Sequence, residues 1–347
     1  MNNFYKNKTV FVTGHTGFKG SWLCKLLVHL GANVYGFSLP ANTSPNLFSI
    51  CDFSDKLTSF IGDIRDINSL TNAFNAASPE IVFHLAAQPL VLEGYQHPVY
   101  TYETNVMGTV NILECIRQSS TVKSFVNVTT DKVYQNNEWS WGYREIDILN
   151  GYDPYSNSKS CSELVTDTYR RSFFSGKNIS ISTARAGNVI GGGDFSADRI
   201  LPDCIRAAFN KQPITLRHPD SIRPYQFVLE PLLAYLLIAE KQYNDVQLAD
   251  SYNIGPDEKD CITTLELVNI FCKSWGEPLS ITYPSNKLLH EANFLRLDSS
   301  KLKSKLNWRP HSDINSAVSM TVEFAKCYIN DGNINRLMEK QIEYYLF

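Results

Sequence analysis

The sequence lacks the features of a disulfide-bonded, metal-bound or membrane-spanning protein. Its eight cysteines are scattered along 347 residues, without a Cys-x-x-Cys pair or a cysteine and histidine spacing typical of metal sites. We therefore expect neither a disulfide framework nor a bound metal. The apolar run at residues 232–239 is far shorter than the roughly 20 residues that cross a bilayer. The first strand begins within about eight residues of Met1, which leaves no room for a signal peptide, so we expect a soluble cytoplasmic protein with no membrane partner.

The sequence also lacks an excess of charge of either sign. It carries 32 lysines and arginines against 35 aspartates and glutamates, for a formal net charge of -3. Binding to a nucleic acid or to an anionic membrane surface usually needs a basic face. We therefore expect no nucleic-acid partner.

Close to the start of the chain stands a glycine-rich turn. Residues 9–12 are an apolar run, residues 21–27 have helical apolar spacing, and between them lies Thr13-Gly14-His15-Thr16-Gly17-Phe18-Lys19-Gly20. Backbone N–H groups at a helix N-terminus can hold a pyrophosphate. We expect Gly14 to form the tight turn, Gly17 to let the backbone approach the ligand, and Gly20 to let the helix pack on the strand. Three glycines at this spacing, taken alone, are more often part of an ordinary loop. The position of this turn between a strand and a helix favours a nucleotide cofactor.

Apolar strands alternate with helix-patterned segments through the first half of the chain. The expected strands are residues 8–13, 33–37, 57–61, 81–85, 124–128 and 179–184, and the expected helices are residues 17–30, 66–77, 99–118 and 155–174. This alternation predicts an α/β protein with a doubly wound parallel sheet, formed by residues 1–186. Residues 187–347 are richer in glycine and proline loops and predict a smaller substrate-binding lobe. A helical segment at 229–241 and a strand at 250–254 predict that residues 225–255 rejoin the first lobe.

The residues after the second expected strand favour NAD over NADP. Residues 38–42 hold no carboxylate where one is expected about 20 residues past the glycine turn, and residues 35–52 hold no arginine or lysine for a 2′-phosphate. Asp63, after the third strand, could accept a hydrogen bond from the adenine amino group. A helix cap is the alternative for Asp63.

Two further segments predict acid–base chemistry. Tyr155 and Lys159 stand four residues apart, which places them on one face of a helix. A lysine ammonium beside a phenol lowers the phenol pKa and makes it a usable base. The strand at 124–128 is followed by Thr130, Asp131 and Lys132, and the sites of doubly wound sheets form at strand carboxyl ends. The alternative for Tyr155 and Lys159 is a solvated pair, and the alternative for residues 130–132 is a polar turn that caps the strand.

Together these motifs resemble the extended short-chain dehydrogenase/reductase superfamily. The runs His-Leu-Ala-Ala-Gln at 84–88, Thr-Asn-Val-Met-Gly-Thr at 104–109 and Arg-Ala-Gly-Asn at 185–188 narrow the resemblance to nucleotide-sugar enzymes. The runs at 14–22, 129–134, 151–155 and 185–194 resemble the CDP-glucose 4,6-dehydratases. The resemblance extends from about residue 8 to residue 255 and is weaker beyond.

The resemblance implies a Rossmann-type fold, NAD as cofactor, CDP-glucose as substrate, a homodimer built on the helices at 99–118 and 155–174, and a role in deoxysugar and O-antigen biosynthesis. Tyr155 would take the proton of the sugar 4-hydroxyl while hydride passes to NAD, with Thr130 bonding that hydroxyl and Lys159 poising Tyr155. Loss of the C5 proton and the C6 hydroxyl, and hydride return to C6, would complete the cycle. Asp131 would protonate the departing hydroxyl. Related dTDP-glucose enzymes carry a glutamate base where Lys132 stands. Lys132 would be the C5 base only if neighbouring charge or burial lowered its pKa. Alternatively, Lys132 would stabilise the enolate and Asp131 would be both acid and base.

The resemblance also implies the residues that hold each ligand. Those expected to bind the cofactor are Gly14, Thr16, Gly17, Phe18, Lys19, Gly20, Asp63, Ile64, Leu85, Ala86, Ala87, Tyr155 and Lys159. Those expected to bind the substrate are Gln88, Thr130, Asn188, Arg199 and Arg223. A surface ion pair is the alternative for Arg199. Leu92-Glu93 stands where related enzymes often carry arginine, which puts a basic substrate contact from that loop in doubt.

Two other functions share part of this pattern. A nucleotide-sugar 4-epimerase uses the same turn with Tyr155 and Lys159 but needs no acid beside Thr130, so Asp131 and Lys132 argue against it. A non-catalytic NAD-sensing protein would have no reason to keep Thr130, Tyr155 and Lys159 together.

Overall fold

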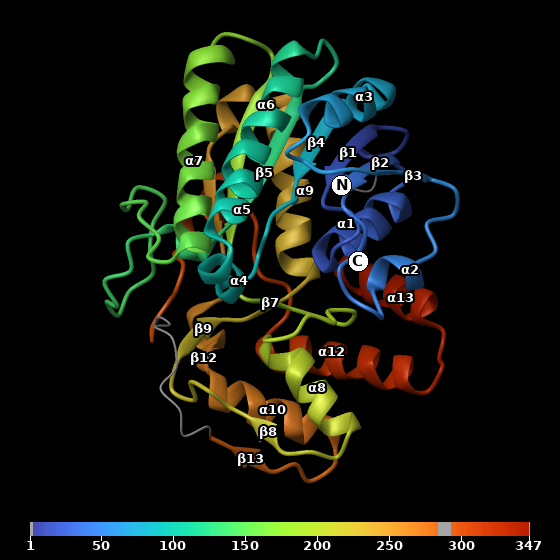
Figure 1. The fold of residues 1–347 in the computed structure, drawn as a ribbon, viewed down its shortest axis with the longest axis vertical. Helices are drawn as coiled ribbons and strands as arrows, with labels where there is room; N and C mark the ends of the chain where they lie inside the picture. The colour runs from blue at the N-terminus through green and yellow to red at the C-terminus, as the bar shows by residue number, and fades with distance from the viewer. Residues whose placement is uncertain (1–2, 284–292, 347) are drawn as a thin grey trace.

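A seven-stranded parallel sheet forms the larger of two lobes (Figure 1). The computed structural model describes residues 3–283 and 293–346. The strand order is β11-β6-β5-β4-β1-β2-β3. The strands are β1 (Thr9–Thr13), β2 (Asn33–Ser38), β3 (Leu57–Ile61), β4 (Ile81–His84), β5 (Ser124–Thr130), β6 (Ser180–Ala186) and β11 (Ser251–Ile254). The predicted doubly wound sheet is confirmed, and the strand expected at 250–254 joins it beside β6.

The strands of this sheet are apolar on both faces because helices cover both. Along β1, Val10 and Val12 belong to one buried cluster and Phe11 to another. Adjacent side chains of a strand point to opposite faces, so β1 contributes to two cores. This explains why β1 reads as a continuous apolar run rather than as an alternating one.

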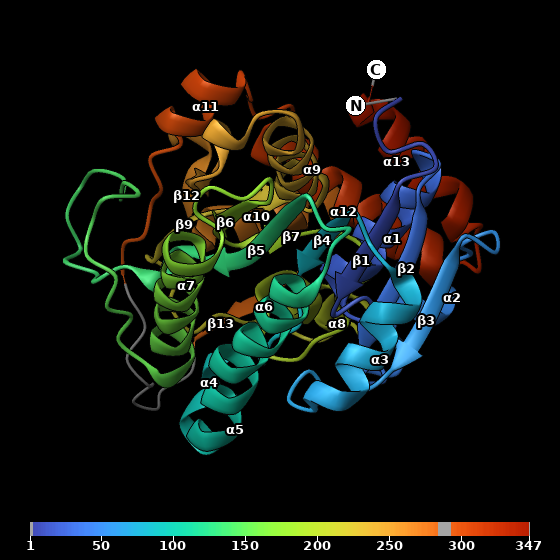
Figure 2. The same cartoon turned by 90° about the horizontal axis from the view of Figure 1, so that it is seen from above.

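Helices of the larger lobe lie in two layers, which Figure 2 shows from above. The layer that shares its core with Phe11 contains α3 (Ile67–Ala77), α6 (Gly108–Gln118) and α7 (Pro154–Phe173). The opposite layer contains α1 (Phe18–His29) and α9 (Leu229–Asn244). The short helices are α2 (Leu47–Ile50), α4 (Val91–Gln96), α5 (Pro98–Tyr102), η2 (Asp131–Val133), η3 (Val246–Leu248) and η4 (Glu258–Asp260).

The helix expected at residues 99–118 is interrupted. A π-helical turn, η1 (Glu103–Met107), separates α5 from α6. Inside this turn Asn105 is buried, and its side-chain amide donates to the Gln88 carbonyl at 3.1 Å and to the Ser158 hydroxyl at 2.9 Å. The turn therefore ties the segment after β4 to α7, and periodicity alone does not reveal such a widened turn.

In the part of the chain that the structure describes, the smaller lobe contains three helices and short strand pairs. The helices are α8 (Ile200–Phe209), α10 (Thr264–Trp275) and α12 (Ile314–Ile329). The pairs are β7 (Val189–Ile190) with β10 (Gln226–Phe227), β9 (Ile222–Pro224) with β12 (Cys261–Thr263), and β8 (Ile214–Thr215) with β13 (Ile281–Thr282).

The chain passes between the lobes several times. It leaves the sheet after β6, returns through α9 and β11, and leaves again to form α10. It then forms α11 (Ser300–Leu306), which contacts β11, before α12 and α13 (Ile334–Leu346). An ion pair of 3.0 Å between Lys25 and Glu339 joins α13 to α1 in the larger lobe.

Candidate active site

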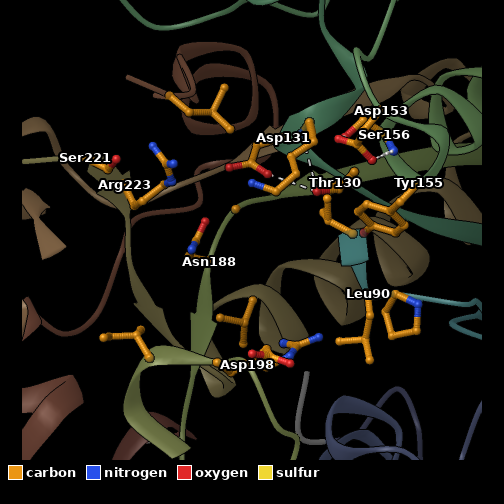
Figure 3. A pocket seen from close by; sticks show the side chains of 18 of the residues that line it. Leu90, Thr130, Asp131, Asp153, Tyr155, Ser156, Asn188, Asp198, Ser221 and Arg223 are labelled. Carbon is orange, nitrogen blue, oxygen red and sulfur yellow. Dashed lines mark hydrogen bonds between the residues drawn. The ribbon is translucent and has the colours of Figure 1, made fainter. Parts of the chain in front are cut away.

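A cavity of about 1280 Å³ lies at the carboxyl ends of the central strands and is closed by the smaller lobe (Figure 3). Its walls come from the turn after β5, the start of α7, the loop after β6, the start of α8, and β9. Strand order reverses between β1 and β4, and ligands of doubly wound sheets bind at such a reversal. The cavity contains Lys19, Thr130, Asp131, Lys132, Tyr155, Asn188, Arg199 and Arg223.

The glycine turn between β1 and α1 is packed too closely for other side chains. Gly14 has a φ of +78°, and a Cβ added there would lie 2.7 Å from the Ala86 nitrogen. A Cβ on Gly20 would lie 2.1 Å from the Gly14 carbonyl oxygen. The backbone clashes exclude any residue but glycine at both positions.

Gly17, by contrast, faces open space at the start of α1. It is exposed, and a Cβ added there would meet nothing closer than 3.4 Å. As the N-cap of α1 it offers no side chain to the first N–H groups of the helix. Those N–H groups have no intrahelical partner and suit a diphosphate, so the turn fits a dinucleotide.

Residues expected beside the cofactor surround this turn. The hydroxyl of Thr16 donates to the Leu39 carbonyl at 2.8 Å and lies 2.9 Å from the Ser38 hydroxyl, which ties the turn to the end of β2. The backbone N–H groups of Leu85 and Ala86 both donate to the Thr13 hydroxyl at 3.2 Å. Leu85 and Ala86 therefore lie against the end of β1, and Ala87 follows them in the chain.

Asp63 is held by Arg65 rather than serving as a helix cap. The Arg65 guanidinium donates to both Asp63 oxygens at 2.7 to 3.1 Å, and this pairing holds the pKa of Asp63 below its usual value. The cap of α3 is Asp66, so the cap alternative for Asp63 is wrong. Ile64 is buried against Gly108 of α6.

Thr130 and Asp131 form a hydrogen-bonded pair on the cavity wall. The Thr130 hydroxyl donates to Asp131 Oδ1 at 2.9 Å. Asp131 is only 1% exposed, and its Oδ2 is buried without a hydrogen-bond partner among the described residues. A buried carboxylate oxygen left unpaired is costly, and it marks a place where a ligand group can complete the bonding.

Tyr155 stands next to this pair, at the first turn of α7. The helix begins there because Asp153 caps it, accepting from the Ser156 N–H at 3.0 Å, and Pro154 follows in a favourable position. Burial raises the pKa of Tyr155 to about 12, although a hydrogen bond with Thr130 lowers it. Thr130 thus links Tyr155 to Asp131.

Lys159, one turn further along α7, is buried behind Tyr155. Its amino group donates to the Val128 carbonyl at 3.0 Å, and burial lowers its pKa to about 8, although the Glu163 carboxylate raises it. The pKa of Tyr155 is raised rather than lowered, because burial of the phenol outweighs the opposing effects of Thr130 and Arg199. The expected support of Tyr155 by Lys159 stays a prediction.

The expected substrate residues divide into two groups. Asn188, Arg199 and Arg223 line the cavity, and Arg199 lies 3.7 Å from the buried Asp194, so its ion pair is part of the cavity wall. The Gln88 side chain is instead turned inward. It donates to Thr101 at 2.8 Å, and it does not belong to the described lining of the cavity.

Sequence reasoning missed a buried ion pair behind the site. Glu163 accepts from Arg185 at 2.8 Å and from the hydroxyls of Thr183 and Thr129, so it joins α7 to β5 and β6. Burial raises its pKa, but Arg185 and the hydroxyls hold it below the usual value. Its spacing of four residues after Lys159 was the available signal.

Among residues 3–283 and 293–346, no cluster of three or more histidines, cysteines, aspartates or glutamates could hold a metal ion. In the same part of the chain, no helix combines the length and apolar character needed to span a membrane.

Solved structures of nucleotide-sugar enzymes share this fold. UDP-glucose 4-epimerase of Thermotoga maritima, solved with UDP-glucose, matches with a TM-score of 0.81 and 22% identity, over 92% of this chain and 99% of that one. dTDP-glucose 4,6-dehydratase of Bacillus anthracis, solved with NAD, matches with a TM-score of 0.79 and 20% identity, over 93% and 98% of the two chains. At these identities the likeness establishes the fold alone.

Sequence relatives identify the family. The chain is 44% identical to CDP-glucose 4,6-dehydratase of Salmonella typhimurium over 350 residues, which cover 99% of this chain and 98% of that protein. It is 26% identical to a probable dTDP-glucose 4,6-dehydratase of Sinorhizobium fredii over 93% of each. The family model described as GDP-mannose 4,6 dehydratase matches residues 11–321. The resemblance in the sequence motifs is thereby confirmed, and the chain belongs to this family of nucleotide-sugar 4,6-dehydratases.

Proposed function

We propose that the protein is an NAD-dependent CDP-glucose 4,6-dehydratase, a hydro-lyase that converts CDP-D-glucose to CDP-4-keto-6-deoxy-D-glucose and water. The observation that carries this proposal is that Tyr155 and the hydrogen-bonded pair of Thr130 and Asp131 line one cavity. Tyr155 and Thr130 suit oxidation at C4, and Asp131 adds the acid that loss of the C6 hydroxyl requires. The name of the Salmonella typhimurium relative supports CDP-glucose as the substrate.

The glycine turn would hold the cofactor. The uncapped start of α1 and the open face of Gly17 suit the diphosphate of NAD, with Phe18 beside them. The absence of a basic residue at 35–52 favours NAD over NADP. The chemistry that NAD supplies when bound is the reversible two-electron oxidation of the sugar.

Tyr155 would accept the proton of the sugar 4-hydroxyl. Only the phenolate form of Tyr155 can accept this proton, and with a pKa of about 12 that form is scarce at neutral pH. The charged form of Lys159, held on the Val128 carbonyl one helical turn away, would stabilise the phenolate and so increase its share before the proton of the 4-hydroxyl is transferred. Thr130 would hold the hydroxyl in line with Tyr155.

Asp131 would protonate the C6 hydroxyl as it leaves. The carboxyl can donate from Oδ2, because Oδ1 already accepts from Thr130 and Oδ2 has no partner among the described residues. Lys132 lines the same wall and could remove the C5 proton. Asp131 alone, with Lys132 stabilising the enolate, remains the alternative. Asn188, Arg199 and Arg223, which line the same cavity, would bind the substrate diphosphate.

A substrate panel tests the proposal. Purified enzyme should be incubated with the CDP-, dTDP-, UDP- and GDP-hexoses, and the products analysed for loss of one water by mass spectrometry. We expect a 4-keto-6-deoxy product from CDP-glucose. An epimerised sugar without water loss would show that the protein is a 4-epimerase, and no turnover with any of the sugars would reject catalysis.

We also propose a homodimer in the cytoplasm. The helical segments α5 to α6 and α7 expose apolar side chains, namely Val99 at 70%, Met107 at 50%, Leu164 at 54% and Phe173 at 41%. Burial of these side chains against a second copy would remove apolar surface from water. Light scattering at micromolar concentration should give twice the chain mass, and a monomer would contradict the proposal.

A further inference from the structure

Lys19 extends from the glycine turn into the substrate cavity. It is the second residue of α1 and lines the cavity that also holds Thr130, Asp131 and Tyr155. Of the glycine turn at residues 13–20, only Phe18 and Lys19 belong to the described lining. Lys19 therefore faces the substrate residues, whereas Gly17 faces the open space that suits the cofactor diphosphate.

The charges around Lys19 are unbalanced. Lys159 from α7 and Arg199 from the start of α8 repel its amino group, and only Asp131 attracts it. Asp194 partly offsets Arg199. The cavity lining also holds Lys132, Tyr155 and Arg223, and the carboxylates of Asp153, Asp198 and Asp203. Among the charges that act on Lys19 itself, two cations therefore oppose one carboxylate, and such an excess attracts an anion.

Neither Lys19 nor Asp131 has all its bonding capacity used. Among the described residues, no hydrogen bond or ion pair engages the Lys19 amino group, and Asp131 Oδ2 is buried without a partner. Two polar groups in one cavity, one of them buried and unpaired, point to a ligand that completes both.

We propose that Lys19 is a further substrate-binding residue, which bonds a diphosphate oxygen of the nucleotide sugar and takes up a proton as the substrate binds. This inference rests on the proposed function, because that function supplies the diphosphate. It moves Lys19 from the cofactor, where the sequence resemblance placed it, to the substrate.

Proton uptake follows from the charges and the burial around Lys19. Burial lowers the pKa of Lys19 to about 7, and Lys159 and Arg199 lower it further than Asp131 restores it. A phosphate oxygen beside the amino group would favour the charged form. At pH 8 a group with a pKa of about 7 is about one-tenth protonated, so full charging takes up about 0.9 proton. Lys159, with a pKa of about 8, can add about half a proton, so the two must be separated by mutation.

Calorimetric titration of NAD-loaded enzyme with CDP-glucose separates the proton uptake of Lys19 from that of Lys159. Titrations at pH 8 in two buffers of different ionisation enthalpy give the number of protons taken up. A Tyr155→Phe background prevents turnover during the titration. In that background we expect Lys19→Met to weaken CDP-glucose binding by about 10- to 100-fold, as for a lost charged hydrogen bond, and to remove most of the proton uptake. Lys19→Arg should retain most of the affinity but take up no proton at this position, because arginine is always charged.

The control is Lys273→Met, on the exposed face of α10 and outside the described cavity lining, which should change neither quantity. Retained NAD content and an unchanged circular dichroism spectrum would show that each variant folds. Wild-type affinity and proton uptake in Lys19→Met would overturn the inference. Weaker NAD binding with unchanged CDP-glucose binding would also overturn it, since Lys19 would then serve the cofactor. If the Tyr155→Phe background itself bound no CDP-glucose, the proposed function would fail first and this inference with it.

Discussion

Replacing Asp131 by asparagine separates the elimination from the oxidation that precedes it. Asparagine keeps the size of the side chain and an oxygen that accepts from Thr130, which now lies 2.9 Å from Oδ1. It removes the acidic proton that Oδ2 would donate. Loss of a positioned general acid typically slows a step by about 10²- to 10⁴-fold, so C4 oxidation should proceed and the C6 hydroxyl should then leave slowly.

The cost to folding is set by the surroundings of Oδ2. A Cβ added to Gly187 would lie 2.9 Å from this oxygen, which shows how closely it is enclosed. The asparagine amide that replaces it would bury N–H groups without a partner, at about 1–3 kcal/mol. The variant should therefore fold, with a measurably lower melting temperature.

Single-turnover absorbance of enzyme-bound NADH is the assay. After mixing with CDP-glucose, Asp131→Asn should accumulate NADH while formation of the 4-keto-6-deoxy product falls. Asp198→Asn is the matched control, because Asp198 lines the same cavity but lies away from Thr130 and Tyr155 in Figure 3, and NADH should not accumulate in it. Product formation at the wild-type rate in Asp131→Asn would refute the assignment of the acid. If Lys132→Met then slowed deuterium exchange at C5 while Asp131→Asn did not, Lys132 would be the base.

Three further variants test the residues on α7. Tyr155→Phe should lower turnover by about 10²- to 10⁴-fold with NAD content retained, and near-normal turnover would reject Tyr155 as the base. Lys159→Met should lose activity yet gain at most about 3 kcal/mol of unfolding free energy at pH 7. The folded-state pKa of Lys159 is lowered to about 8, so the charge of Lys159 destabilises the fold fully below pH 8, and the gain in stability should vanish towards the unfolded pKa of about 10.4. Chemical denaturation across this pH range measures the gain. An unchanged or lower stability of the variant at pH 7 would contradict this prediction. Glu163→Gln should cost about 3–5 kcal/mol by leaving Arg185 buried and unpaired. Because the pKa of Glu163 is depressed, this contribution to stability is present above the unfolded pKa of about 4.3 and is lost as the pH falls through the lower folded-state pKa. The melting temperatures of wild type and variant should therefore converge in acid. A difference in melting temperature that stays constant with pH would contradict the stabilising role of the Glu163–Arg185 pair.

The sheet and the catalytic segments could be predicted because their signals are local. Strand β4 (Ile81–His84) lies within the expected strand at 81–85, since a short apolar run between turns indicates a buried strand. Tyr155 and Lys159 share a helix, so their spacing alone places them together. The pairing of Glu163 with Arg185 could not be predicted in this way, because it joins α7 to β6 and depends on the tertiary arrangement.

Burial and side-chain direction were the least predictable properties of the site. Gln88 belongs to a motif run, yet its amide turns inward to Thr101. The raised pKa of Tyr155 follows from its enclosure, which sequence spacing does not report.

The repeated passage of the chain between the two lobes limits how the enzyme can move. Opening about a hinge is easiest where one or two segments connect two bodies, whereas here the connections after β6, before α9, after β11 and before α12 would all have to bend together. We therefore expect the lobes to stay fixed relative to each other during turnover, with sugar nucleotides entering and leaving through local rearrangement of surface loops. Limited proteolysis should accordingly nick loops without releasing either lobe as a folded fragment.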